Sequence, residues 1–473
     1  MAVARVRELP GDKSAPQAAG QSQLGQRRRL VFAVVSIALF MASVDQTIVA
    51  TALGSLQRDL HAPVNWSSWT ITIYALGQII AMPAAGTISD MYGRKKVFLG
   101  AIVLFTVASL CCGLANDIYV LVALRAAQAL GGGAFTPSAT GIVSDQFGPD
   151  RDRAIGLFSS VFPIGGIVGP VLGGLFVTYW SWRGIFLVNV PLGIALFCLA
   201  IVFLPSGTKK STRRLDLLGI GLLASGLLGV MLAVSYLGSS TASALSVPFI
   251  LPLMVGAGAL VLFVRHATRA EAPFVPLRLL AGREFATMNV INFLIGTAIL
   301  GFGALVPLYA QERYHLSSLA AGTLLTARAV GMISVAALAT FALRRTGYRL
   351  PMIVGLGIAA TGLTLMSVSP LWLTPYGWLT IVVGLTGIGI GMALPASNNA
   401  TLQRAPENTA AVAGLRGMFR QSGGITGIAL ITAVVARSAD PGHALAYAFG
   451  VLAFLLVCLL PAVFLISDHR GQW

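Results

Sequence analysis

Long, nearly uninterrupted apolar runs constrain this chain more than any other feature of its sequence. Residues 30–53 and 97–115 are two examples, and each is close to the roughly 20 residues that an α-helix needs to cross a bilayer. A membrane-spanning β-barrel would instead show alternating segments of about 10 residues. Hydrophobic residues make up 56% of the 473 positions and charged residues 10%, with a mean hydropathy of +0.82. The sequence therefore predicts an all-α polytopic membrane protein.

Fourteen such runs follow a polar N-terminal segment. Residues 1–29 contain Pro10 and Pro16 and end in three consecutive arginines, so we predict a disordered cytoplasmic tail there. A cleaved signal peptide is not expected, because the run after the arginines is too long and lacks a small-residue cleavage site. The predicted transmembrane helices begin near Leu30, Trp66, Lys96, Ile118, Ala154, Gly184, Leu215, Val247, Phe285, Leu319, Leu350, Tyr376, Ala410 and Leu445.

The distribution of basic residues tests this count independently, since Lys and Arg gather in the cytoplasmic loops of membrane proteins. The two termini and the loops after even-numbered spans hold 24 of the 32 Lys and Arg residues, whereas the other loops hold 4. This split predicts an even number of spans in the cell membrane, with both termini in the cytoplasm. The net charge of +16 is thus explained by basic residues in cytoplasmic loops. We therefore expect no nucleic-acid partner.

A weak internal repeat relates two loops. Residues 86–95 align with residues 340–349, which matches Gly93 to Gly347 and keeps a basic cluster in both. The repeat predicts two six-helix bundles, over residues 30–205 and 284–473. Between them, residues 206–283 form a basic linker with two inserted transmembrane helices, which gives a 6+2+6 arrangement. Parallel repeats of this kind place a substrate site near the midplane between the halves.

Reactive residue types do not gather as an enzyme would require. The histidines are scattered outside the predicted spans, and the cysteines lie within apolar runs, where we expect them to pack. No G-x-x-x-x-G-K-[ST] loop occurs, so ATP is not the expected direct energy source. We therefore expect no enzyme activity, no metal site and no cofactor.

The loop after the second span carries Gly86, Asp90, Gly93, Arg94 and Lys95. It resembles the G-x-x-x-D-R-x-G-R-R signature of the major facilitator superfamily. The resemblance implies a major facilitator fold and a cytoplasmic gate loop, in which the carboxylate, the turn glycine and the basic residues hold neighbouring helices together. Met91 departs from the basic residue usual there. The alternative is an ordinary basic cytoplasmic loop.

A glycine-rich segment lies in the fifth span. Gly165, Gly169, Pro170, Gly173 and Gly174 resemble the G-x-x-x-G-P-x-x-G-G antiporter motif of the drug exporters in that superfamily. Glycines four residues apart allow close helix packing, and proline removes a backbone hydrogen bond. The resemblance implies a contact that seals one side of the cavity. General small-residue packing is the alternative for the glycines.

The first and fourth spans hold ionisable residues. The segment around Asp45 is similar to the L-D-x-T-I-V-N-V-A-L-P signature of fourteen-helix drug:proton antiporters, although Ala50 and Gly54 depart from it. Arg125 and Gln128 resemble the R-x-x-Q-G motif of the superfamily, with Ala129 in place of its glycine, and they share a helix face. Asp45 is the one acidic residue placed well inside a span, which makes it a candidate proton site with Arg125. The alternative is a fixed structural ion pair.

We expect a substrate cavity lined by Gln128, Asn189, Arg328, Arg416 and Arg420. Arg420 belongs to a family-like R-Q element, whereas Arg328 and Arg416 have no counterpart in the motifs. Arginine facing lipid is costly, so we expect these side chains in a wet cavity or, for Arg416, near the cytoplasmic surface. Four arginines against one aspartate in the spans favour negatively charged or zwitterionic substrates.

The resemblance implies a proton-coupled antiporter that exports drugs, antibiotics or related small organic molecules by alternating access, as a monomer. Its partners would be protons, a small-molecule substrate and the lipid bilayer. A uniporter or symporter for a small organic anion would share the fold, and only the motif of the fifth span argues against it. A receptor or scaffold would not need Asp45 and Arg125 within the membrane.

Overall fold

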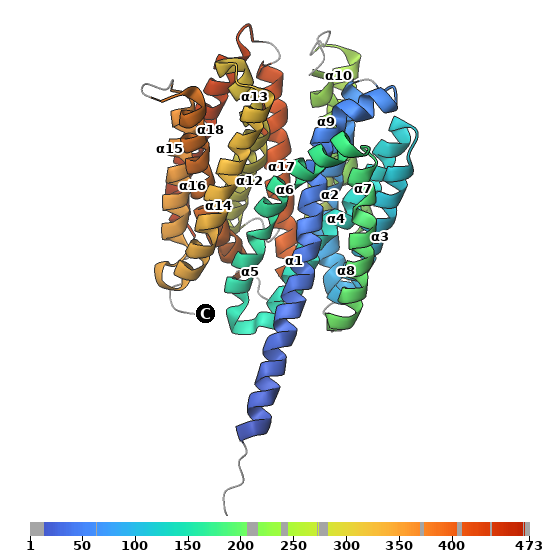
Figure 1. Ribbon diagram of the computed structural model, residues 1–473, viewed down its shortest axis with the longest axis vertical. Coiled ribbons are helices and arrows are strands. Elements are labelled where there is room, and N and C mark those ends of the chain that lie inside the picture. The colour runs from blue at the N-terminus through green and yellow to red at the C-terminus, as the bar shows by residue number, and fades with distance from the viewer. Residues whose placement is uncertain are drawn as a thin grey trace, which may run out of the picture.

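The computed structural model describes residues 14–62, 64–205, 216–237, 245–271, 273, 282–368, 373–403, 409–435, 438–466 and 468. Within these ranges the regular secondary structure is entirely helical, as predicted, and the helices form an elongated bundle (Figure 1). Its helices are α1 Ser14–Asp59, α2 Val64–Tyr92, α3 Arg94–Leu114, α4 Ile118–Phe147, η1 Gly148–Asp150, α5 Arg151–Ser159, α6 Val161–Tyr179, α7 Gly184–Leu187, α8 Asn189–Phe203, α9 Leu217–Leu237, α10 Val247–Arg269, α12 Arg283–Gly296, η2 Thr297–Gly301, α13 Phe302–Tyr314, α14 Ser318–Thr346, α15 Arg349–Met366, α16 Pro375–Gln403, α17 Thr409–Val435 and α18 Pro441–Val463.

The helices agree in order with the predicted spans. Twelve helical segments among the described residues are long and apolar enough to cross a membrane. The other two predicted spans correspond to α9, whose apolar part covers Leu217–Ala233, and to α17, which carries two arginines. The arrangement is therefore consistent with fourteen spans.

The start of α1 differs from the sequence-based prediction. Residues 1–13 of the predicted disordered tail lie outside the described residues, but the chain is helical from Ser14 onward. Pro16 falls in the first turn, where its missing N–H costs no helical hydrogen bond. The Ala, Gln, Leu and Arg residues that follow favour helix. As a result, α1 extends well beyond the lower end of the bundle (Figure 1).

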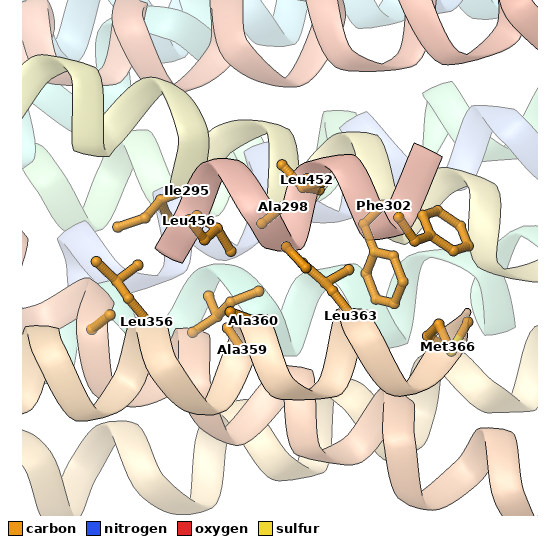
Figure 2. Packing of buried hydrophobic residues seen from close by; sticks show 14 of the residues in the cluster. Ile295, Ala298, Phe302, Leu356, Ala359, Ala360, Leu363, Met366, Leu452 and Leu456 are labelled. Atoms are coloured by element: carbon orange, nitrogen blue, oxygen red, sulfur yellow. The ribbon is translucent and has the colours of Figure 1, made fainter. Parts of the chain in front are cut away.

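Two groups of helices lie side by side in Figure 1, α1–α8 in blue to green and α12–α18 in yellow to red. The second group has its own apolar core, in which Leu356, Leu363 and Met366 of α15 face side chains of α12, η2, α13 and α18 (Figure 2). One cluster of the first group also takes in residues of α16 and α17, among them Leu402 and Val412. The two groups therefore share a core over part of their length.

The two loops of the internal repeat adopt related conformations. Gly93 and Gly347 both have a positive φ, 98° and 71°, which glycine adopts without steric cost. Lys95 Nζ donates to the carbonyl of Leu204 at 2.7 Å, and Arg349 Nε donates to that of Ile466 at 2.6 Å. In both halves a basic side chain two residues after the glycine thus binds carbonyl groups at the end of the sixth helix of its bundle. We call this end of the molecule the basic end.

The glycines of the predicted antiporter motif form a seam between α6 and α1. A Cβ atom added at Gly165 would lie 2.6 Å from Ser43 Cβ, and additions at Gly169 and Gly173 would overlap the hydroxyl groups of Thr47 and Thr51. Ser43 Oγ also donates to the carbonyl of Phe162 at 2.5 Å. Side chains four residues apart on α1 thus fit against glycines four residues apart on α6.

Gly174 lies off this seam, because a Cβ added there would meet no atom within 4 Å. It does not share the packing role predicted for the motif glycines, and it serves as a matched control for Gly169. Pro170 lies between them in α6 and supplies no backbone donor to the helix.

We predict that Gly169→Leu destabilises the protein and Gly174→Leu does not. A side chain at Gly169 must displace Thr47 and separate α1 from α6, and such overpacking costs about 1–3 kcal/mol. The measurements are the melting temperature in detergent and transport in proteoliposomes for both variants. An unchanged melting temperature and normal transport for Gly169→Leu would contradict the role of the seam.

Candidate functional site

Asp45 lies at the centre of a buried polar network. Its side chain is 0% exposed, and that of Arg125 on α4 is 1% exposed. Arg125 Nη1 lies 2.7 Å from Asp45 Oδ2. Asp45 Oδ1 accepts from Gln128 Nε2 at 2.9 Å and from Asn189 Nδ2 at 3.0 Å. Four site residues predicted from the sequence, on α1, α4 and α8, are thus brought together.

Further contacts hold Arg125 in place. Its Nη1 donates to Gln128 Oε1 at 2.7 Å, and its Nε donates to the carbonyl of Thr70 at 3.2 Å. The guanidinium carbon also lies 4.0 Å from the centre of the Tyr74 ring, which is cation–π geometry. Arg125 and Gln128 reach one carboxylate because residues three apart share a helix face.

Sequence reasoning missed several members of this network. Ser109 Oγ on α3 accepts from both Gln128 Nε2 and Asn189 Nδ2 at 3.0 Å, and donates to the carbonyl of Phe186 at 3.0 Å. Tyr74 and Ser109 lie in apolar surroundings of their helices, and no motif marks them. Only the packing of α2 and α3 against α4 reveals their role.

The network matches an ionised carboxylate. The contacts described above supply Asp45 with one charged and two neutral donors, the pattern that stabilises the charged form. Removing the charge of Asp45 would leave a buried guanidinium without its counterion, which is strongly unfavourable. Asp45 and Arg125 therefore compensate each other's buried charge.

The predicted gate loop forms a second polar cluster, at the basic end. Arg94 lies 3.5 Å from Asp90 Oδ1 and 2.5 Å from Asp145 Oδ2. It also donates to the carbonyl of Gly141 and, at 3.3 Å, to Thr409 Oγ1 at the start of α17. Arg94 therefore joins α2 and α4 to the second half of the chain. Asp145 was not predicted, although its place at the end of the fourth span parallels that of Asp90.

Other contacts between the halves also lie near this end. A Cβ at Gly86 of α2 would lie 2.6 Å from the carbonyl oxygen of Ala410, and Gly156 of α5 fits against Thr340 of α14. The guanidinium carbon of Arg153 lies 4.5 Å from the ring centre of Phe341. Gly86 thus acts in close helix packing, and the halves are in contact at the basic end.

Arg328, in α14, binds main-chain groups. Its Nη2 donates to the carbonyls of Ile299 at 2.6 Å and Ala298 at 3.3 Å. Both carbonyls belong to η2, a π-helical turn, which departs from the i→i+4 pairing of an α-helix. A side chain at Gly303 would collide with this guanidinium group. The structure thus separates Arg328 from the Asp45 network and gives it partners of its own.

Arg416 and Arg420 lie one turn apart in α17. Arg416 is 4% exposed, and its Nε and Nη1 have no hydrogen-bond partner. The guanidinium carbon of Arg420 lies 5.9 Å from the ring centre of Phe162 on α6. Among the described residues, no ion pair joins Arg328, Arg416 or Arg420 to a carboxylate.

Comparison with known proteins places these features in a family. The sequence profile of the Major Facilitator Superfamily matches residues 35–428. The multidrug resistance protein B homolog of Mycobacterium tuberculosis is 30% identical over 452 residues, which cover 91% of this chain and 83% of that protein. The multidrug transporter protein MdtP of Bacillus subtilis is 28% identical over 423 residues, 88% of this chain and 76% of its own.

Two further similarities concern length and fold. An uncharacterized MFS-type transporter of Mycobacterium tuberculosis is 32% identical over 371 residues, and the match spans 78% of this chain but only about half, 53%, of that protein. The crystal structure of the human organic anion transporter MFSD10 has the same fold, with a TM-score of 0.66 at 15% identity over 92% of this chain and 99% of that one. The superfamily consists of membrane-embedded transporters of small molecules and not of enzymes. By its matching profile, its relatives and its helical fold, the chain belongs to the major facilitator superfamily.

Proposed function

We propose that this protein is a proton-coupled antiporter that exports drugs or related small organic molecules across the cell membrane. Relatives named as multidrug transporters support the cargo class. The observation that carries the coupling is the fully buried pair of Asp45 and Arg125, held between α1 and α4. An ionisable pair within a membrane span has a high energetic cost and marks a functional site.

Proton coupling would work through exchange of partners at Arg125. Protonation of Asp45 removes its charge and leaves the guanidinium group to Gln128, Thr70 and cargo. The same helix, α1, carries Ser43 and Thr47 in the seam with α6. A shift of α1 on the change of charge would therefore be passed to that seam. No cofactor takes part, and the proton is the coupling ion.

Alternating access would use the contacts at the basic end, which the distribution of basic residues assigns to the cytoplasm together with both termini. Arg94 binds groups of α2, α4 and α17 there. Release of these contacts would open the cytoplasmic side, and their formation would close it while the opposite side opens. We propose that the protein does this as a monomer.

The arginines of the second half favour cargo with negative or zwitterionic charge. Arg328, Arg416 and Arg420 lack ion-pair partners among the described residues, and an anion supplied from outside would compensate buried positive charge. The same observation supports the second candidate, a uniporter or symporter for a small organic anion. Transport against a cargo gradient driven by an imposed pH gradient separates the candidates, because an antiporter moves cargo opposite to the proton.

We predict that Asp45→Asn abolishes pH-gradient-driven transport while leaving downhill exchange of cargo. The substitution keeps the side-chain volume and removes titration. It also leaves Arg125 as an uncompensated buried charge, which we expect to lower stability by about 3–5 kcal/mol. The measurement is uptake of ethidium and of carboxyfluorescein into proteoliposomes with and without a pH gradient, alongside the melting temperature.

Two controls separate coupling from folding. Asp59→Asn alters a half-exposed aspartate at the C-terminal end of α1 and should leave coupling intact. The double variant Asp45→Asn with Arg125→Gln restores neutrality and should recover the melting temperature without recovering coupling. Gradient-driven transport by Asp45→Asn would refute Asp45 as the proton site and direct attention to Glu312, an exposed residue in the last turn of α13.

We predict that Arg94→Gln opens the basic end. The neutral amide cannot pair with both Asp90 and Asp145, so the contact to α17 weakens. The reporter is Thr340→Cys, at the contact with Gly156, in a background where Cys111, Cys112, Cys198 and Cys458 are replaced by serine. Labelling by a membrane-impermeant maleimide should become several-fold faster with Arg94→Gln. Equal rates with and without that substitution would show that Arg94 does not hold this end closed.

A further inference from the structure

Arg416 combines deep burial with unused hydrogen-bonding capacity. It is 4% exposed, and its Nε and Nη1 reach no acceptor. Arg328 is 9% exposed and its Nε also has no hydrogen-bond partner, but its Nη2 binds two carbonyls of η2. A guanidinium group stays charged at any relevant pH, and a buried charge without a counterion is strongly unfavourable. Of these two buried arginines, Arg416 is therefore the one that calls for an external partner.

Carboxylates on helices that pack against α17 are already engaged. These helices include α2, α12, α4 and α9, and Glu284 of α12 has an interaction partner. Asp90 of α2 and Asp145 of α4 bind Arg94, and Asp216, which precedes α9, binds His266 at 2.8 Å. The next cation along the same face of α17 is Arg420, which adds positive charge. The electrostatic field at Arg416 is therefore suited to an anion.

Arg416 also lies where the halves meet. It is the eighth residue of α17, roughly 10 Å from the basic end of that helix at 1.5 Å per residue. Its neighbours in sequence, Gly414 and Gly417, fit against Met82 of α2, and a Cβ at Gly417 would lie 2.6 Å from Met82 Sδ. Contact between α17 and α2 encloses residues 414–417 of α17. Separation of the two helices would expose these residues toward the basic end.

We propose that Arg416 binds the anionic group, a carboxylate or sulfonate, of an organic cargo molecule. The site rests on the proposed function, because it takes cargo from the side that opens when the halves part at the basic end. A carboxylate can accept two hydrogen bonds from the guanidinium group, including one from Nε, which now has no partner. When α17 closes on α2, the guanidinium group of Arg416 is enclosed, and a bound anion then compensates its charge. The closed state is therefore more stable with anionic cargo than without it.

The test uses two dyes that differ by one charge, diethylaminocoumarin carboxylate and its carboxamide. Binding to the purified full-length protein in nanodiscs of uncharged lipid is measured by fluorescence anisotropy, without a pH gradient. We expect the carboxylate to bind roughly tenfold more tightly than the carboxamide, a difference of about 1.4 kcal/mol. Arg416→Gln should abolish this difference, Arg416→Lys should keep part of it, and Arg269→Gln, at an exposed residue in the last turn of α10, should keep all of it.

Melting temperatures without dye give a second readout. Arg416→Gln should raise the melting temperature because it removes an unpaired buried charge, whereas Arg328→Gln should lower it because two hydrogen bonds are lost. Equal binding of both dyes by the native protein, or a carboxylate preference that survives Arg416→Gln, would overturn the proposal. So would competition by chloride without any preference between the dyes, which would indicate an inorganic anion site.

The binding assay also separates this proposal from the proposed function. Carboxylate-selective binding that depends on Arg416, in a protein that shows no pH-gradient-driven transport, would refute proton coupling and keep the anion site. Proton-coupled transport with no preference for the carboxylate would refute the anion site alone.

Discussion

The ion pair between Asp45 and Arg125 is the interaction on which the first half of the protein depends. Either charge alone would be costly in a low-dielectric interior, and α1 and α4 present them to each other. Gln128 and Asn189 complete the carboxylate's hydrogen bonds, which ties α8 to the same point. Another face of α1 packs its small hydroxyl side chains against the glycines of α6. The seam with α6 therefore also fixes the position of α1, the helix that carries Asp45.

The two halves share architecture but differ in charge. Gly93 and Gly347 make equivalent turns, and Lys95 and Arg349 bind equivalent helix ends. The first half pairs its buried arginines, Arg94 and Arg125, with aspartates, whereas Arg328 in the second half binds the carbonyls of a π-helical turn. Among the described residues, the buried arginines without a carboxylate partner therefore lie in the second half. This asymmetry supports the two proposals, a proton site in the first half and a site for an anionic group in the second.

The contacts at the basic end explain how two such halves can cooperate. Arg94 joins three helices, and close helix packing at Gly86 and Gly156 brings the halves together there. Glycine contacts of this kind let helix backbones approach closely with little interlocking of side chains. In the proposed mechanism, the charge-assisted hydrogen bonds of Arg94 would form when this side closes and break when it opens.

The sequence by itself determined the membrane-spanning helices, their order and the charged residues among them, because span length and the placement of Lys and Arg are properties of the chain that need no partner. It also placed Arg125 with Gln128, and Gly165 with Gly169, on common faces, since helical periodicity is local. Only the tertiary structure decided which helix each face meets. It added Ser109 and Tyr74 to the Asp45 network, gave Arg94 the partner Asp145, moved Gly174 off the seam and supplied Arg328 with the carbonyls of η2. Those outcomes depend on how helices cross and on the π-helical hydrogen bonding of η2. Both arise from the packing of segments far apart in the sequence, so no periodic pattern of residues predicts them.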